Sequence, residues 1–489
     1  MTPAILALDA GTSNAKAVLC EVGTGAVMAR AGVPLALQVL GPREVEQDAE
    51  HILSGLLAAA REACAAAAGC EVVAIALTNQ RESVVAWERS TGRPLGPMLS
   101  WQDSRTSAEL ESWDPDARAR VKQITGLTLD AMYSAPKMRW LLDQLPGSRS
   151  AGSDVVVGTL ESWLIARLTG EAITESGNAS RTLLMSLSAG DWDDELLNAF
   201  DIPRGSLPPV RPSNASFGVV RSEWGAPLAG VPIVAVLADS HAALFAHSTG
   251  AEGIAKATLG TGTSVMVALP RLDTPREGID VTVAWWLDHP TYALEGNIVS
   301  TGQVIDWVAN LLDPAAARPG GIVVAELAAT VDDSSGVTFV PAFTGLGAPH
   351  WDRGATALVS GMTAGSKAAH LARAALESVG HQVADVVEAM VQNGSADVAE
   401  LRVDGGGSSS DLLLQVHADV VGMPVVRVRE PELSAIGAAR LASVVLGSDP
   451  GPAVGDTVVD PGWTPERRAH ERRIWQREVA RARMRIEEI

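Results

Sequence analysis

The chain has 489 residues, 47% of them hydrophobic and 20% charged, which is enough for two or three domains with large cores. Its 58 acidic and 38 basic residues give a formal charge of −20, which argues against broad contacts with nucleic acid or an anionic membrane. Three cysteines without metal-ligand spacing argue against a disulfide framework or a zinc site. A local pocket for one small anion remains compatible with this charge.

The N-terminal apolar run, Ala4 to Leu8, is too short for a signal peptide and has no positive charge before it. No stretch of about 18 uncharged apolar residues follows. We therefore expect a soluble, cytoplasmic protein.

The first half of the chain alternates between strand-like and helix-like patterns. Two short apolar runs, 5–8 and 17–20, flank a Gly/Thr/Ser turn and predict a hairpin. Residues 48–68 have apolar residues at helical spacing and precede a buried-type strand at 71–77. The alternation recurs over 155–168 and 231–246, which predicts an α/β protein.

The second half begins as the first did, with apolar residues 254–259, a Gly/Thr turn and apolar residues 265–269. The repeat indicates two similar α/β halves, although Gly-Thr-Ser turns also recur by chance. A break at 248–253 places the expected boundary between domains 1–247 and 248–489. From Thr464 onward, interspersed Arg and Glu predict a salt-laced, solvated helix rather than a nucleic-acid arm.

Three turns could bind a nucleotide. The first comprises Asp9, Gly11, Thr12 and Ser13, with Lys16 nearby. Its N–H groups and hydroxyls suit phosphate oxygens, and its carboxylate could hold Mg²⁺. The second spans 260–264 and the third is the glycine cluster 404–410, where a base or ribose could approach the backbone. Each alone is commonly a plain turn; together they favour a triphosphate held between two halves.

A polar set at the ends of predicted strands could bind a second ligand. Arg81 and Glu82 offer a donor fork beside an acceptor, suited to two hydroxyls, and Trp101 could provide a flat wall. Asp239 could accept a hydroxyl proton. The alternative is structural: Arg81 pairs with Glu82, Trp101 is core, and Asp239 caps a helix.

The motifs together resemble the FGGY family of carbohydrate kinases, from Asp9 to about Gly447. Residues 132–144, with Ser134, Lys137, Trp140 and Asp143 in register, look like the first family signature, and residues 361–377 look like the second. This resemblance implies two duplicated actin-like, ribonuclease H-like domains of the hexokinase–Hsp70–actin superfamily, with the nucleotide cleft between them. It also implies ATP, Mg²⁺ and a small polyhydroxyl substrate, and relatives are often homo-oligomers.

Within the family, segments such as 79–82, 178–182 and 292–296 are most similar to glycerol kinases. That likeness implies that Asp239 is the catalytic base and Asp9 a metal-associated carboxylate. It implies substrate contacts for residues Arg81, Glu82, Trp101, Met132, Ser240 and Ser264. It implies ATP contacts for Gly11, Thr12, Ser13, Lys16, Thr261, Gly302, Asp306, Gly406 and Ser410. Ser410 replaces an asparagine and Asp306 a glutamine, so nucleoside contacts are expected to differ.

The pocket departs from the glycerol kinases at three positions. Met132 replaces a tyrosine, with Tyr133 one position later, while Ser240 replaces a glutamine and Ser264 a phenylalanine. The loss of bulk predicts a four- or five-carbon polyol or ketose, phosphorylated at a terminal hydroxyl. A true glycerol kinase is the alternative. An actin- or chaperone-like ATPase and a degenerate regulatory sugar-binding protein are alternatives of other classes.

Overall fold

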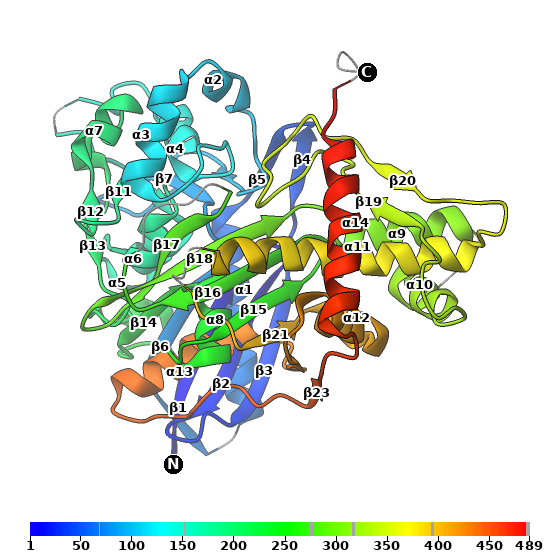
Figure 1. Cartoon of the computed structure of the whole chain (residues 1–489). Helices are drawn as coiled ribbons and strands as arrows, with labels where there is room; N and C mark the ends of the chain where they lie inside the picture. The colour runs from blue at the N-terminus through cyan, green and yellow to red at the C-terminus, as the bar shows by residue number, and fades with distance from the viewer. Residues whose placement is uncertain (68, 151, 273–277, 315–317, 393–395, 486–489) are drawn as a thin grey trace.

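The computed structural model describes residues 1–67, 69–150, 152–272, 278–314, 318–392 and 396–485. Two large sheets dominate it, one in each half of the chain (Figure 1). The first sheet has the order β14-β6-β1-β2-β3 and consists of β1 (Thr2–Ala10), β2 (Asn14–Glu21), β3 (Val27–Pro34), β6 (Cys70–Asn79) and β14 (Ile233–Ala238).

The second sheet repeats the arrangement of the first. In the first sheet, β1 and β2 form an antiparallel hairpin, and the later strand β6 pairs in parallel with β1. In the second, β15 (Ile254–Leu259) and β16 (Thr263–Leu269) form the hairpin, and the later strand β21 (Glu400–Asp404) pairs in parallel with β15. The predicted pair of similar α/β halves is confirmed. In sheet order, the strands are β17 (Asp280–Trp286), β18 (Pro290–Ile298), β16 (Thr263–Leu269), β15 (Ile254–Leu259), β21 (Glu400–Asp404), β22 (Val425–Arg427) and β23 (Thr457–Val459).

The remaining strands form smaller sheets. A five-stranded sheet contains, in order, β4 (Gln38–Gly41), β5 (Glu44–Gln47), β8 (Met98–Leu99), β7 (Val84–Glu88) and β9 (Val155–Thr159). Three two-stranded pairs are β10 (Thr174–Glu175) with β13 (Val210–Arg211), β11 (Met185–Ser186) with β12 (Asp191–Trp192), and β19 (Thr338–Val340) with β20 (Leu358–Ser360).

Fourteen α-helices lie in the described part of the chain. Those of the first half are α1 (Ala49–Ala66), α2 (Ser107–Glu111), α3 (Pro115–Thr125), α4 (Ser134–Asp143), α5 (Leu160–Thr169), α6 (Ser176–Ser180), α7 (Asp194–Ala199) and α8 (Asp239–Ser248). Those of the second half are α9 (Gly302–Leu312), α10 (Gly320–Ala328), α11 (Ala368–Val391), α12 (Asp411–Val421), α13 (Leu433–Val445) and α14 (Pro465–Ala482). None of the helices in the described ranges is long and apolar enough to cross a membrane.

Helix α1 shows how local sequence sets an element. The carboxylate of Asp48 accepts hydrogen bonds from the N–H groups of Glu50 and His51, which caps the first turn. Ile52, Leu53 and other apolar residues at helical spacing are buried against β1, β2 and β3. The helix predicted within 48–68 is confirmed over Ala49–Ala66, and residue 68 lies outside the described residues.

Helix α13 crosses between the halves. Although it follows β22 of the second sheet, it packs against α8 and against β1, β6 and β14 of the first sheet. Gly437 approaches Ala242 so closely that a Cβ would lie 1.8 Å from the Ala242 carbonyl oxygen. Glycine is therefore required at this helix crossing.

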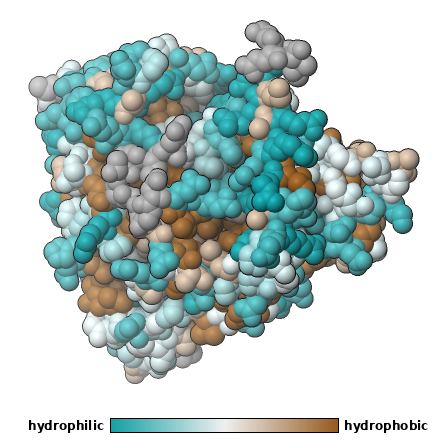
Figure 2. Space-filling model, viewed as in Figure 1, coloured by the Kyte–Doolittle hydropathy of each residue, from teal (hydrophilic) through white to brown (hydrophobic). Residues whose placement is uncertain are grey.

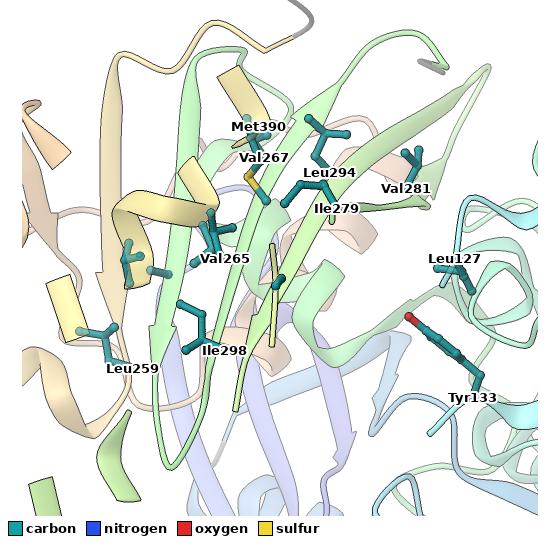
Figure 3. Close-up of a cluster of buried hydrophobic side chains, with 14 of the residues drawn as sticks. Leu127, Tyr133, Leu259, Val265, Val267, Ile279, Val281, Leu294, Ile298 and Met390 are labelled. Carbon is teal, nitrogen blue, oxygen red and sulfur yellow. The ribbon is translucent and has the colours of Figure 1, made fainter. Parts of the chain in front are cut away.

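The largest hydrophobic cluster also joins the halves. It brings Leu127 and Tyr133 of the first half together with Val281 and Leu294 of the second, and these side chains are buried (Figure 3). The expected division at residue 247 therefore does not divide the hydrophobic core.

The segment Pro465–Ala482 forms helix α14, as predicted, and the outer surface of this helix is largely hydrophilic (Figure 2). Arg477 and Arg481 both pair with Glu478. One arginine is not solvated: Arg472 is buried and bonds Asp385 of α11.

Candidate active site

Two cavities lie beside the predicted nucleotide turns. The first, of about 840 Å³, is lined by Asp9, Lys16, Asp239 and Ser240 from the first half and by Gly406 from the second. The second has a volume of about 870 Å³. It is lined by all the second-half residues that were predicted to contact ATP: Thr261, Gly302, Asp306, Gly406 and Ser410. Gly406 and Ser409 line both cavities, so the two spaces adjoin.

The first turn joins β1 to β2 and places Asp9 opposite Lys16 in the strand register. The N–H of Gly11 donates to the Asn14 carbonyl, and a Cβ on Gly11 would lie 3.0 Å from that oxygen. Thr12 and Ser13, which follow, are not buried. The Thr12 hydroxyl is hydrogen-bonded to Trp101 and Gln80, so the turn leaves the exposed Ser13 hydroxyl open to a ligand.

Gly302 fixes the second turn. A Cβ there would lie 2.5 Å from the Gly260 carbonyl oxygen, so only glycine allows α9 to begin this close to the turn. In the third turn, the Ser410 hydroxyl accepts the N–H of Leu413 and caps α12.

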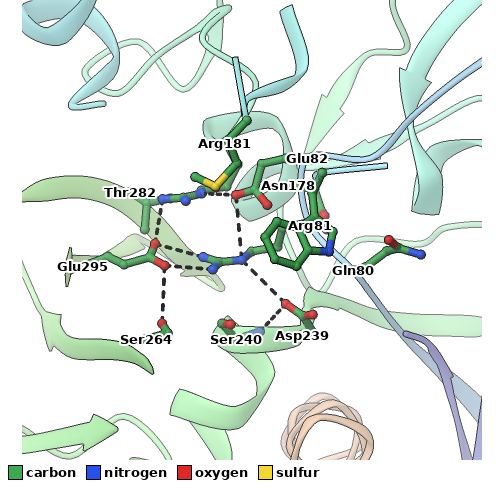
Figure 4. A network of polar contacts seen from close by, with 12 residues as sticks. Gln80, Arg81, Glu82, Asn178, Arg181, Asp239, Ser240, Ser264, Thr282 and Glu295 are labelled. Carbon is green, nitrogen blue, oxygen red and sulfur yellow. Dashed lines mark hydrogen bonds and ion pairs between the residues drawn. The ribbon is translucent and has the colours of Figure 1, made fainter. Parts of the chain in front are cut away.

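A network of buried ion pairs lies next to the first cavity (Figure 4). The two terminal nitrogens of Arg81 donate to Glu295 at 2.9 and 2.8 Å. Arg181 donates to Glu82 at 2.7 Å and to Glu295 at 2.6 Å. All four side chains are buried. Burial opposes ionisation of Glu295, but Arg181 and Arg81 hold its pKa below the ordinary value.

This network limits which atoms of Arg81 could contact a substrate. We expected the fork of Arg81 to face two hydroxyls, but it faces Glu295 instead. The free donor toward Asp239 is Nε, which lies 3.6 Å from Asp239 Oδ1 and 3.8 Å from Glu82 Oε1. These distances exceed a hydrogen bond, so a substrate hydroxyl could accept the N–H of Arg81 Nε and donate its one proton to one of the two carboxylates.

Asp239 begins α8, directly after β14, and its Oδ1 accepts the N–H of Ser240 at 2.6 Å. The side chain is 35% exposed, unlike the buried carboxylates of the network, so a substrate can reach it. Partial burial raises the pKa of Asp239, and the charge of Arg81 opposes the rise.

The residues that we expected to line the substrate pocket differ in burial and in their hydrogen-bond partners. Trp101 is partly buried, and its Nε1 donates to the Thr12 hydroxyl at 3.0 Å. Met132 is partly buried, whereas Tyr133 is fully buried and donates its hydroxyl to Asp280 at 2.7 Å. Tyr133 thus does not substitute for a pocket tyrosine. The Ser264 hydroxyl contacts Glu295 at 3.4 Å.

Comparison with known proteins agrees with this architecture. Models of the FGGY family of carbohydrate kinases match residues 4–246 as the N-terminal domain and 255–446 as the C-terminal domain. The chain is 41% identical to a glycerol kinase of Citrifermentans bemidjiense, over 97% of each chain. It belongs to the FGGY family of carbohydrate kinases. It is accordingly an ATP-dependent carbohydrate or polyol kinase, and the ATPase without kinase activity and the degenerate binding protein are set aside.

Other relatives of this FGGY kinase differ in the names they carry. An apulose kinase of Pectobacterium atrosepticum is 38% identical over 99% of each chain. Among solved structures, Plasmodium falciparum glycerol kinase with ADP is 26% identical, with a TM-score of 0.91 and 99% of each chain covered. A xylulose kinase of Rhodospirillum rubrum, at 23% identity and a TM-score of 0.87 over 98% of each chain, shares the fold.

Sequence reasoning missed the partners that organise the site of this FGGY kinase. Glu295 and Arg181 were noted only as parts of family-like segments, although a lone carboxylate in the apolar strand β18 is a signal of a buried pair. Lys256 is likewise a lone cation in β15, and it donates to Thr258 at 3.0 Å. Thr258 in turn donates to Asp404, and both residues line the first cavity.

The carboxylate of Asp9 in this FGGY kinase is buried, which disfavours its ionised form. It is only 6% exposed, its Oδ1 has no hydrogen-bond partner among the described residues, and burial raises its pKa to about 7, with Lys16 opposing. Between pH 4 and 7 the unfolded chain loses this proton first, so the ligand-free protein loses stability as the pH rises.

Asp9→Asn removes this titration. Relative to the parent, the ligand-free variant should gain about 2–3 kcal/mol of unfolding free energy between pH 5 and pH 8. Urea unfolding at both pH values measures the change. Parallel pH dependence in the two proteins would contradict the assignment.

Proposed function

We propose that this kinase transfers the γ-phosphoryl group of ATP to a terminal hydroxyl of a four- or five-carbon polyol or ketose. One observation carries the proposal: Asp239 lines the first cavity and also lies 3.6 Å from Arg81 of the polar network. One accessible carboxylate therefore adjoins both a space suited to phosphates and donors suited to an alcohol.

Each residue of the proposed site has a separate role in phosphoryl transfer. Asp239 accepts the proton of the attacking hydroxyl, while Nε of Arg81 and the carboxylate of Glu82 orient the substrate. The two turns supply the N–H groups of Thr12, Ser13 and Thr261 and the hydroxyls of Ser13 and Thr261 to the phosphate oxygens, and Lys16 adds a positive charge. Catalysis rests mainly on alignment and electrostatics, because phosphoryl transfer needs no covalent enzyme intermediate.

The donor set fits Mg²⁺. Asp9 lines the first cavity and presents a buried carboxylate oxygen without a hydrogen-bond partner among the described residues, so it would hold the ion directly or through water. Bound Mg²⁺ would neutralise charge on the nucleotide phosphates. A chain with a charge of −20 needs such a counterion for a triphosphate.

Mg²⁺ with ADP should raise the melting temperature of the parent but not of Asp9→Asn.

The side chains around the proposed alcohol pocket favour a substrate larger than glycerol. Ser240 and Ser264 are small, and Tyr133 is held away from the pocket by Asp280. The space left by a missing glutamine and phenylalanine suits additional carbons and hydroxyls. The names of the relatives include both glycerol kinase and apulose kinase, so glycerol remains the alternative substrate.

Refilling the pocket tests this inference. The double variant Ser240→Gln, Ser264→Phe should shift the ratio of kcat/KM for glycerol to that for the best four- or five-carbon substrate by about 10–100-fold toward glycerol. ADP release is measured with glycerol, erythritol, D-ribulose, D-xylulose and apulose. Efficient turnover of glycerol by the parent, with the longer compounds inert, would select the glycerol kinase alternative.

A further inference from the structure

We propose that Lys137 is a positioning residue that fixes two wall segments of the alcohol pocket relative to each other. It lies in the first turn of α4 and is completely buried. Its ammonium group donates to the Met132 carbonyl at 2.6 Å and to the Ser100 carbonyl at 3.2 Å. Ser100 directly precedes Trp101, so one side chain ties the Met132 segment to the Trp101 segment. The inference rests on the proposed function.

The same helical turn holds a third part of the site. The Ser134 hydroxyl donates to the Glu82 carbonyl at 3.2 Å. Glu82 has a φ of 60°, a left-handed conformation that is unfavourable for a non-glycine residue and needs support from its surroundings. The first turn of α4 therefore anchors the backbones of Glu82, Trp101 and Met132.

Charge pairing does not explain a lysine at this position. Both hydrogen-bond acceptors of Lys137 are backbone carbonyls, and burial lowers its pKa to about 7 despite the charges of Glu82, Asp103 and Asp130. An apolar side chain of similar length would avoid this desolvation cost. What it could not do is donate two hydrogen bonds from one point, which is the property that links the two segments.

Loss of this link should act on the alcohol rather than on the nucleotide, because none of these contacts reaches the second cavity. A displacement of about 1 Å in a positioning group can cost about 10²-fold in rate. For Lys137→Met we expect the KM of the alcohol to rise at least 10-fold and the KM of ATP to stay within about twofold.

The control is Arg472→Met, which removes a buried cation that bonds Asp385 of α11, away from the pocket walls. It should lower the melting temperature without changing the ratio of the two KM values. The alcohol is the compound that the parent phosphorylates best among glycerol, erythritol, D-ribulose, D-xylulose and apulose. If the parent uses none of them, the proposed function fails.

Hydrogen–deuterium exchange tests Lys137 without any substrate. In Lys137→Met, amides of 97–106 and 129–134 should exchange faster than in the parent, while those of 259–264, which none of these contacts reaches, should not change. Lys137→Gln, which keeps an N–H donor but is one atom shorter, should show an intermediate effect. The inference is overturned if exchange at the wall segments is unchanged, if both KM values rise together, or if neither variant folds while Arg472→Met does.

Discussion

Asp239→Asn should lower kcat by about 10²–10⁴-fold, the usual contribution of a general base, and leave ADP affinity nearly unchanged. The amide keeps the size of the side chain but cannot accept the hydroxyl proton. The position is suited to this role because Asp239 is the partly exposed carboxylate beside Arg81. Coupled ADP release measures kcat, and calorimetric titration measures ADP binding.

The pH profile and a matched variant make this prediction specific. Because burial raises the pKa of Asp239 and the base must be ionised, kcat/KM should fall on the acid side at a higher pH than a free aspartate would require. Asp116→Asn, at an exposed carboxylate on α3, should leave kcat unchanged. Turnover by Asp239→Asn above a tenth of the parent value would refute the role of base.

Arg181→Met should lower the free energy of unfolding by about 3–5 kcal/mol, because it leaves Glu82 and Glu295 buried with one cation, Arg81, in place of two. It should also raise the KM of the alcohol, since Arg81 and Glu82 belong to the same network. Urea unfolding and substrate kinetics measure the two effects.

An exposed pair provides the comparison for Arg181. Arg120 and Glu195 lie 2.7 Å apart with side chains 50% and 52% exposed, so solvent screens the pair and Arg120→Met should leave the free energy of unfolding nearly unchanged. If the two variants lose similar stability, the buried network does not contribute as described.

The local parts of the site could be predicted from the sequence. Turn residues and hydrophobic periodicity are properties of neighbouring residues, so the hairpins, α1 and the placing of Lys16 beside Asp9 followed from short segments. Family-like motifs added the second-half residues, such as Thr261 and Gly302, which the structure places around one cavity.

The partners of these residues could not be predicted in the same way. Arg81 and Glu295 are 214 positions apart, and Tyr133 and Asp280 are 147 apart, so their pairing depends on how the two halves pack. Without that packing, Arg81 was assigned to the substrate with its full donor fork. In the structure, the terminal nitrogens of Arg81 pair with Glu295, and Nε is the atom that faces Asp239.

The crossing of α13 has a consequence for synthesis of the chain. One face of the first sheet, formed by β1, β6 and β14, is covered by α13, which begins about 185 residues after the end of α8. At about 5–20 residues per second, a ribosome needs about 10–40 s to make that intervening length. During this interval the strands of the first half have been made, but α13, which packs against β1, β6 and β14, has not. The first half therefore cannot complete its core before the second half emerges. Chaperone demand should therefore be concentrated in that interval of translation.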